Sequence, residues 1–194
     1  MNTYFNETMR ILSQSVESMD METFGRLADE CCGALERGSK IIVSGLGKNV
    51  PVCDKFVGTM NSLGMRADFM NTNSAVHGDL GMVREGDLVI ILTKSGETVE
   101  SVYLTQLLKA RGADMWLLSF REKSTLTREI PKHLILNLEH EGDMWNIVPS
   151  NSTTVNLIVL QGLAISLAQR MGITLDRFKQ NHPGGFIGEQ LKNA

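Results

Sequence analysis

The sequence predicts an α/β fold: a three-layer sandwich in which a flavodoxin-like, five-stranded parallel sheet carries helices on both faces. Short apolar runs rich in β-branched residues, such as residues 88–92 (Leu-Val-Ile-Ile-Leu), alternate along the chain with longer segments of helical periodicity. Such runs are too short for helices and are typical of buried strands. Strands that alternate with helices form a parallel sheet that is covered on both faces.

Residues 1–38 are expected to form N-terminal helices. The apolar residues of the first helix recur at alternating spacings of four and three, as on one face of an amphipathic helix: Phe5, Met9, Leu12, Val16 and Met19. A second helical pattern follows and ends at Gly38, a predicted C-cap. Two alternatives remain open for these helices. They pack on a second subunit, or they cover an edge of the sheet.

Residues 39–194 are expected to form the α/β core and the C-terminal helices. The predicted strands are residues 40–44, 66–70, 88–92, 115–120 and 134–138. The predicted helices are residues 50–63, 98–110, 124–129, 152–171 and 175–179, and three of them end at glycines: Gly64, Gly112 and Gly172. We expect residues 1–194 to be one domain, because 194 residues with 42% hydrophobic side chains can bury a full core.

Composition and charge exclude several classes of function. The net charge is −3 and the basic residues are scattered, which argues against nucleic acid or a membrane as a partner. The most apolar segment, residues 155–168, is too short to cross a bilayer, and the N-terminus lacks the pattern of a signal peptide. Cys31, Cys32 and Cys53 have no metal-ligand spacing and are expected to be reduced thiols. We therefore predict a cytoplasmic protein that needs no metal and no cofactor.

Residues 93–100 are expected to form a turn from the third strand into a helix, and this turn has the properties of an anion site. It gathers the hydroxyl groups of Ser95 and Thr98 around Gly96, where the first backbone amides of the helix have no partner. A phosphate is the natural ligand, and Glu100 would face the same pocket. The alternative is ordinary helix capping, because Ser, Thr and Glu are common in a first turn.

The first strand ends in a second glycine-bearing turn, Ser44-Gly45-Leu46-Gly47-Lys48. Neither nucleotide-binding motif is met, because Val50 and Ile42 stand where those motifs require glycine. Lys48 would neutralise a phosphate or stabilise a developing oxyanion; the alternative is a solvated lysine. In the flavodoxin-like strand order, the first and third strands flank the ligand-binding switch point, so both turns are expected at one site.

Two histidines stand in turn-forming sequences. His77 lies in the loop after the second strand. His182 precedes Pro183 and two glycines, so its backbone is expected to be extended. Considered separately, each is either a structural or a catalytic residue, and the structural role is the commoner one.

Together, these motifs resemble those of the sugar isomerase (SIS) family of phosphosugar-binding domains, and within it the arabinose 5-phosphate isomerases. The matching motifs are residues 45–48, 77–82, 95–100 and 182–185, so the resemblance covers almost the whole chain. It implies a domain that binds a sugar phosphate and usually assembles as a homotetramer. Longer family members carry a pair of CBS modules after this domain, which we expect this chain, ending at Ala194, to lack.

The resemblance also implies roles for individual residues. By position it places the catalytic set at Lys48, Glu100, Glu141 and His182, with His77 lining the site where subunits meet. It implies that three hydroxyl groups and the glycines of the two turns bind the phosphate: Ser44, Gly45, Gly47, Ser95, Gly96 and Thr98.

The chain departs from the family pattern at positions that are expected to line the pocket. Asn49 stands where serine is usual and Lys94 where asparagine is usual, and residues 141–145 and 149–154 also differ. The sequence therefore leaves the identity of the sugar open.

The implied reaction interconverts ribulose 5-phosphate and arabinose 5-phosphate through an enediol. Glu100 or Glu141 would be the base, and Lys48 would stabilise the enediolate oxygen. His182 or His77 would assist opening of a cyclic sugar. Two alternatives are kept: an enzyme like the 6-phospho-3-hexuloisomerases, and a non-catalytic phosphosugar sensor, which would need the anion turn but not Glu100, Glu141 or His182.

Apolar surface predicts self-association. The apolar face of the first helix exceeds what one sheet edge needs, and the helix at residues 152–171 is apolar nearly all round. Both features favour a closed homo-oligomer, which the family resemblance makes a tetramer. His77 or His182 would then reach the pocket of a neighbouring subunit.

Overall fold

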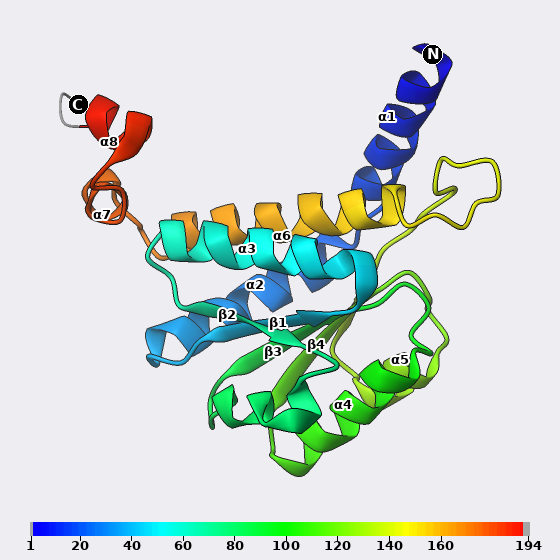
Figure 1. Cartoon of the computed structure of the whole chain (residues 1–194), viewed down its shortest axis with the longest axis horizontal. Helices are drawn as coiled ribbons and strands as arrows, with labels where there is room; N and C mark the ends of the chain where they lie inside the picture. Colours follow the sequence, from blue (N-terminus) through cyan, green and yellow to red (C-terminus); the bar gives the residue numbers. More distant parts are fainter. Residues whose placement is uncertain (1, 192–194) are drawn as a thin grey trace.

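Five parallel strands form one central sheet in the computed structural model, which describes residues 2–191 (Figure 1). The strands are β1 (Ile41–Gly45), β2 (Ala67–Asn71), β3 (Leu88–Leu92), β4 (Asp114–Ser119) and β5 (His133–Ile135). Their order is β2-β1-β3-β4-β5, and every neighbouring pair is parallel. The predicted flavodoxin-like sheet is confirmed, with its switch point between β1 and β3.

Helices cover both faces of the sheet. On one face lie α2 (Met21–Glu36), α3 (Val50–Ser62) and α6 (Asn151–Arg170), with α1 (Asn2–Glu17) packed on α6 (Figure 1). On the other face lie α4 (Val99–Ala110) and α5 (Thr125–Glu129). Two short helices, α7 (Leu175–Gln180) and α8 (Gly185–Leu191), follow the end of α6. Single turns of 3₁₀ helix form η1 (Gly47–Asn49), η2 (Ala75–His77) and η3 (Asp79–Met82).

Alternate residues of strands β1 to β4 enter two separate hydrophobic cores. Ile90 of β3 packs with the helices on the α3 side, and its neighbour Ile91 packs with those on the α4 side. All five residues of β1 and all five of β3 are buried. This explains why their sequences are apolar without alternation, and it confirms the three-layer arrangement.

The predicted elements are present, but the prediction was wrong at two places in the C-terminal half of the chain, β5 and α8. β5 is shorter than the predicted strand 134–138, because it pairs with β4 alone and β4 ends at Ser119. The amide of Leu136 still donates to the Ser119 carbonyl oxygen, 2.8 Å away, and the ladder then has no further partner strand. Helix α8 was not predicted, since Pro183 and the two glycines after it were interpreted as an irregular turn.

Helices α1 and α6 keep part of their apolar surface exposed. Leu12 of α1 is buried, but Phe5 and Met9 are 60% and 65% exposed on the part of α1 that projects from the body (Figure 1). Helix α6 is the only helix in residues 2–191 with the length and mean hydropathy of a membrane span. Half of its apolar window is buried, against α1, α2 and α3, as expected for a core helix.

The turn after β3 is fixed by its contact with the start of α5. Gly96 has φ +70°, and a Cβ atom there would lie 2.1 Å from Ser124 Oγ and 2.6 Å from Ser124 Cβ. The Gly96 amide donates to Thr93 Oγ1 (3.0 Å), and its carbonyl oxygen accepts from the Leu126 amide (3.1 Å). Ser124 is buried and caps α5, so it has no room to move aside. Gly96 is therefore required by packing.

Replacement of Gly96 by alanine should destabilise the fold more than the same change at Gly112. Gly112 has nearly the same φ, +69°, but no atom within 4 Å of its ideal Cβ position. Gly112→Ala should cost about 1–2 kcal/mol from backbone strain alone. Gly96→Ala should cost on the order of 3 kcal/mol or more, because overpacking adds to the strain. Chemical denaturation of both variants measures the difference, and equal losses would contradict this account of the turn.

Candidate functional site

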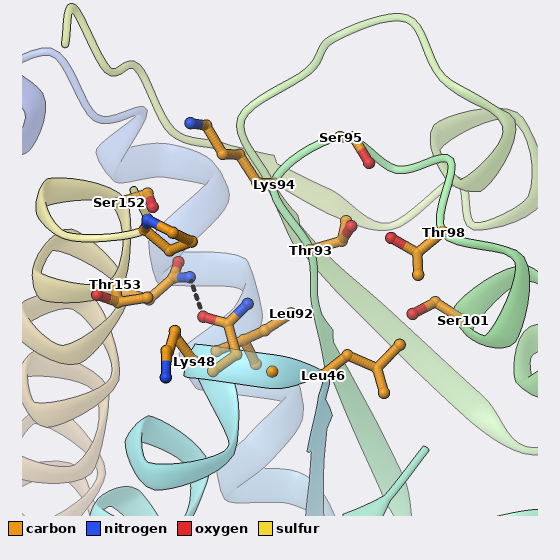
Figure 2. Close-up of a pocket in the computed structure, with 14 residues that line it drawn as sticks. Leu46, Lys48, Leu92, Thr93, Lys94, Ser95, Thr98, Ser101, Ser152 and Thr153 are labelled. Atoms are coloured by element: carbon orange, nitrogen blue, oxygen red, sulfur yellow. Dashed lines mark hydrogen bonds between the residues drawn. The ribbon is translucent and has the colours of Figure 1, made fainter. Parts of the chain in front are cut away.

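A pocket of about 240 Å³ lies at the carboxyl ends of β1 and β3, at the predicted switch point (Figure 2). Three segments line it, namely the turn after β1, the turn after β3 with the start of α4, and the start of α6. The lining residues of the first two segments are Leu46, Gly47, Lys48, Asn49, Leu92, Thr93, Lys94, Ser95, Thr98 and Ser101. Those of the third are Pro149, Ser152, Thr153 and Asn156.

The N-terminus of α4 is open on the side of this pocket. Thr98 is the N-cap residue, but its side chain makes no capping hydrogen bond. The first helical bond runs from the Val102 amide to the Thr98 carbonyl oxygen, so the amides of residues 99–101 have no acceptor inside the helix. The hydroxyl groups of Ser95, Thr98 and Ser101 gather at the same place (Figure 2). Free amides, hydroxyl donors and the helix dipole together make an anion site.

Other helices of this protein begin differently. Asp20, Ser124 and Thr174 cap α2, α5 and α7 with their own side chains. At the pocket, α3 and α4 both begin without a side-chain cap. The start of α3 is preceded by a 3₁₀ turn in which the Val50 amide donates to the Gly47 carbonyl oxygen, and Pro51 has no amide N–H. The helix N-terminus left available to a ligand is therefore that of α4.

An asparagine pair forms the part of the pocket near α3. Asn156 Nδ2 of α6 donates to Asn49 Oδ1 at 3.0 Å (Figure 2). Asn156 is 1% exposed, and its Oδ1 atom has no hydrogen-bond partner among the described residues. An unpaired buried amide oxygen is unfavourable by itself, so this atom is available to accept from a ligand hydroxyl group.

The pocket carries positive charge. Lys48 and Lys94 are among its lining residues, and no carboxylate is. The nearest partner of opposite charge is Glu141, whose Oε1 lies 2.5 Å from Lys94 Nζ. Lys48 has no ion pair among the described residues and is exposed at the rim. The charge and the open helix N-terminus favour the same kind of ligand, an anion.

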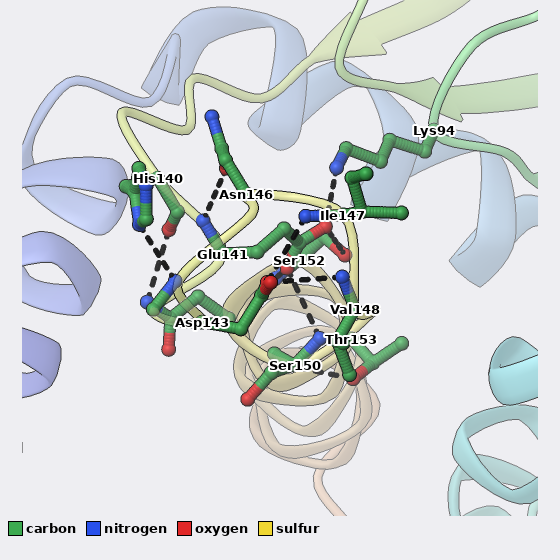
Figure 3. A network of polar contacts seen from close by, with 12 residues as sticks. Lys94, His140, Glu141, Asp143, Asn146, Ile147, Val148, Ser150, Ser152 and Thr153 are labelled. Carbon is green, nitrogen blue, oxygen red and sulfur yellow. Dashed lines mark hydrogen bonds and ion pairs between the residues drawn. The ribbon is translucent and has the colours of Figure 1, made fainter.

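Glu141 is buried beside the pocket and caps α6 from outside the helix (Figure 3). Its Oε2 accepts from the amides of Ser150 and Ser152, at 3.0 and 2.9 Å. Its Oε1 accepts from Ser152 Oγ at 2.7 Å and from Lys94 Nζ. The side chain is 0% exposed. Glu141 therefore accepts from backbone amides at the start of α6 that would otherwise have no partner, and it also joins α6 to the turn after β3.

The electrostatics keep Glu141 ionised. Burial alone raises the pKa of the Glu141 carboxyl, but the hydrogen bonds from Lys94, Ser152 and Ser150 outweigh burial and hold this pKa below its ordinary value. The loop that carries Glu141 is held in a similar way. The carboxylate of Asp143 accepts from the amides of Trp145, Ile147 and Val148, at 2.9 to 3.0 Å (Figure 3).

Three of the predicted phosphate-binding residues, Ser44, Gly45 and Gly96, do not line the pocket. Ser44 is buried, and its hydroxyl is 3.0 Å from that of Thr72, so it joins β1 to the loop after β2. A Cβ atom on Gly45 would lie 2.9 Å from Asn49 Cβ, which makes Gly45, like Gly96, a packing requirement. The other three, Gly47, Ser95 and Thr98, do line the pocket.

The predicted catalytic residues lie in separate places. Lys48 lines the pocket and Glu141 lies behind Lys94. Glu100, in the first turn of α4, and His77, in η2, are exposed and are not among the lining residues. Of these four residues, Lys48 lines the pocket, Glu141 contacts the lining residue Lys94, and Glu100 and His77 do neither.

His182 lies at the opposite end of α3 from the pocket. Its Nε2 is 2.8 Å from the hydroxyl of Ser62, the last residue of α3, and its ring stacks on Phe178 with centroids 4.0 Å apart. Helix α3 has 13 residues, so about 20 Å separates His182 from the pocket of its own subunit.

Ser101 and Asn156 line the pocket but were not predicted from the sequence. Ser101 follows Thr98 by three positions, so the two share one face of a helix, and that spacing could have indicated it. Asn156 is polar within an apolar helix, which is the signal that was available for it. Among the described residues, no three His, Cys, Asp or Glu side chains are grouped so that they could hold a metal ion.

Comparison with known proteins identifies the family. The SIS domain family matches residues 34–167. Arabinose 5-phosphate isomerase KdsD of Pseudomonas aeruginosa is 31% identical over 192 residues, which cover 97% of this chain and 59% of the relative. KdsD of Escherichia coli K12 is 34% identical over 152 residues, covering 78% of this chain and 46% of the relative. The chain thus spans about half the length of the curated relatives that it matches.

Solved structures agree in fold. An Escherichia coli CFT073 protein in complex with arabinose 5-phosphate superposes with a TM-score of 0.86 and 27% identity, over 93% of this chain and 94% of that one. A putative phosphosugar isomerase involved in capsule formation from Bacteroides fragilis gives a TM-score of 0.87 and 26% identity, over 94% and 97%. The fold and the open helix N-terminus define an α/β domain with an anion pocket at its switch point. The chain belongs to the SIS domain family.

Replacement of Glu141 by glutamine should destabilise the protein at neutral pH and much less in acid. A glutamine amide would point N–H groups at the donors that Glu141 now accepts from, which should cost about 2–3 kcal/mol. The pKa of Glu141 is lower in the folded chain than in the unfolded chain, where it is about 4.3. Its contribution is therefore complete above the unfolded pKa and is lost as the pH falls through the folded pKa.

Denaturation of both proteins between pH 7 and pH 3 measures this difference in unfolding free energy. Glu139→Gln is the matched control, because Glu139 lies two residues away, half exposed, in a surface pair with Arg10. This control should change stability by less than about 0.5 kcal/mol. A difference between wild type and Glu141→Gln that stays constant down to pH 3 would show that the charge of Glu141 is not what holds α6.

Proposed function

We propose that this protein is an aldose–ketose isomerase of sugar phosphates that interconverts ribulose 5-phosphate and arabinose 5-phosphate. The observation that carries the proposal is the open N-terminus of α4, with three hydroxyl groups, inside a positively charged pocket. Such a site fits the phosphate of a small ligand. The choice of sugar is supported by the arabinose 5-phosphate isomerases among the relatives and by the structural neighbour in complex with that sugar phosphate.

The proposed mechanism moves one proton between neighbouring carbons. The phosphate binds at Ser95, Thr98 and Ser101, and the carbon chain extends across the pocket. A carboxylate removes the proton from the carbon beside the carbonyl group and returns it to the former carbonyl carbon, through an enediol. Lys48, at the rim, donates to the oxygen that becomes negative. Glu100 is the proposed base, because both oxygens of Glu141 are already occupied.

Opening of a cyclic sugar by His182, the role that the family resemblance implies for it, would require more than one subunit. His182 is about 20 Å from its own pocket, along the 13 residues of α3, so it can act only at the site of a neighbouring subunit. We propose a homotetramer. The exposed apolar residues Phe5 and Met9 on α1, and Ile165 on α6, support burial of these faces between subunits.

The proposed enzyme is one phosphosugar-binding domain that acts in the cytoplasm. Its three cysteines are unpaired, which fits a reducing compartment. Burial raises the pKa of Cys53, next to the turn after β1, to about 12, so this thiol is not a candidate nucleophile.

A panel of sugar phosphates tests the proposed activity. We expect turnover of ribulose 5-phosphate and arabinose 5-phosphate, measured as interconversion by NMR. Glu100→Gln should lower kcat by about 10² or more, on the order of a general base, with little change in the Kd of the ligand. Glu97→Gln is the matched control, because Glu97 precedes α4 but faces α5, where it accepts from the Thr125 amide.

The outcomes separate the alternatives. Turnover of hexulose 6-phosphates alone would favour an enzyme like the 6-phospho-3-hexuloisomerases. Binding of sugar phosphates without any turnover would favour the sensor. Unchanged kcat in Glu100→Gln would remove Glu100 from the mechanism.

Mixing two inactive variants tests whether the site is shared. Glu100→Gln and His182→Ala should each be inactive alone. If the histidine crosses between subunits, mixed oligomers contain some pockets that have both groups, and activity partly returns. Native mass spectrometry verifies that the subunits have exchanged. Exchange without recovery, or a monomer by light scattering, rules out the shared site.

A further inference from the structure

We propose that Lys94 recognises the sugar part of the ligand, and that Glu141 is the positioning residue that aims Lys94. In this arrangement Lys94 Nζ keeps its bond to Glu141 and donates its remaining N–H groups to a hydroxyl or carbonyl oxygen of the sugar. The proposal rests on the sugar-phosphate function above, and it identifies the contact that distinguishes a sugar phosphate from free phosphate.

The first support is that Glu141 has no capacity left for a ligand. A carboxylate has about four acceptor positions on its two oxygens. The amides of Ser150 and Ser152, the hydroxyl of Ser152 and the ammonium of Lys94 fill them. Since the side chain is also 0% exposed, substrate cannot touch it without displacing one of these donors.

The second support is that Lys94 does have capacity left. An ammonium group carries three N–H donors, and Glu141 is the only acceptor recorded for Lys94 among the described residues. The Lys94 side chain is 45% exposed and lines the pocket. Two N–H donors of Lys94 are therefore available to a ligand.

The third support is where Lys94 reaches. Its backbone belongs to the turn after β3, next to Ser95, but its side chain extends toward Ser152 on the opposite wall (Figure 2). The hydroxyl groups of Ser95, Thr98 and Ser101 lie on the other side of the turn. A ligand with its phosphate at those hydroxyl groups would present its sugar chain to Lys94.

The bond to Glu141 explains how a flexible lysine can be selective. A free lysine side chain loses much conformational entropy when it binds a ligand. Here the buried carboxylate is itself fixed by three bonds to the start of α6, and it holds the ammonium in place before a ligand arrives. Preorganisation of this kind improves affinity by lowering the entropy lost on binding.

Calorimetric titration with two ligands tests the proposal. The ligands are inorganic phosphate and arabinitol 5-phosphate, a sugar-alcohol phosphate that cannot isomerise. Lys94→Met should raise the Kd of arabinitol 5-phosphate about tenfold or more, as expected for a lost charged hydrogen bond, and leave the Kd of phosphate within about twofold. Lys94→Arg should restore most of the affinity. Lys123→Met is the matched control, because Lys123 is exposed outside the pocket, and neither Kd should change.

Two results would overturn the proposal. Equal weakening of both ligands by Lys94→Met would mean that Lys94 only adds positive charge, and no weakening would mean that it only pairs with Glu141. If Lys94→Met does not fold, Lys94→Gln takes its place in the same titration.

The positioning role of Glu141 is tested by combining variants. If Glu141 acts through Lys94, Glu141→Gln should weaken arabinitol 5-phosphate, and the double variant should bind it no more weakly than Lys94→Met alone. Additive losses would overturn the role of Glu141. Failure of the proposed isomerase function gives a different result from failure of the Lys94 proposal. If only the isomerase function is wrong, the wild-type protein binds arabinitol 5-phosphate more tightly than phosphate but converts no sugar phosphate.

Discussion

The shape of the pocket depends on the hydrogen bonds that the carboxylate of Glu141 accepts. It is buried, and a buried charge is costly unless it is paired and hydrogen-bonded. Four donors from two different segments satisfy it, and those segments are opposite walls of the pocket. Removing any one donor would leave a charge partly unpaired in the interior. The walls are therefore held at a fixed separation by the need to keep one carboxylate satisfied.

The same requirement explains why the neighbouring helix is free to bind a ligand. Every helix begins with amides that need acceptors. At α6 the need is met by Glu141, and at α5 by Ser124, so these ends are closed. Thr98 provides no cap for α4, and its hydroxyl, with those of Ser95 and Ser101, adds donors at the open end. The open end of α4 thus lies between the two turns that the strand order brings together.

Local sequence was enough for most of the fold and for half of the site. Apolar runs predicted the strands, most directly β1 and β3, because burial on both faces leaves a continuous apolar pattern. Terminal glycines predicted where helices end. The turn around Ser95 and Thr98 was predicted from its position at a helix N-terminus, and the structure places both residues in the lining of the pocket. The packing roles of Ser44 and Gly96 were not predicted, because they come from Thr72 and Ser124, which are distant in sequence. The saturation of Glu141 depends on four donors in a folded chain, and no spacing rule predicts that.

The positions of the charged groups set a final constraint on the chemistry. Two lysines of the chain line the pocket, and the nearest carboxylate, Glu141, lies behind Lys94 with both oxygens engaged, so this arrangement fits an anion but offers no free base. Glu100 and His77 are exposed near this edge of the sheet, and His182 is exposed in part at the far end of α3. A single subunit therefore contains the binding half of a site. Proton transfer at this pocket would require either that Glu100 turns toward the ligand or that a second copy of the chain contributes a group. The apolar residues that are exposed in one chain, among them Phe5 and Met9, offer a surface on which such a copy could pack.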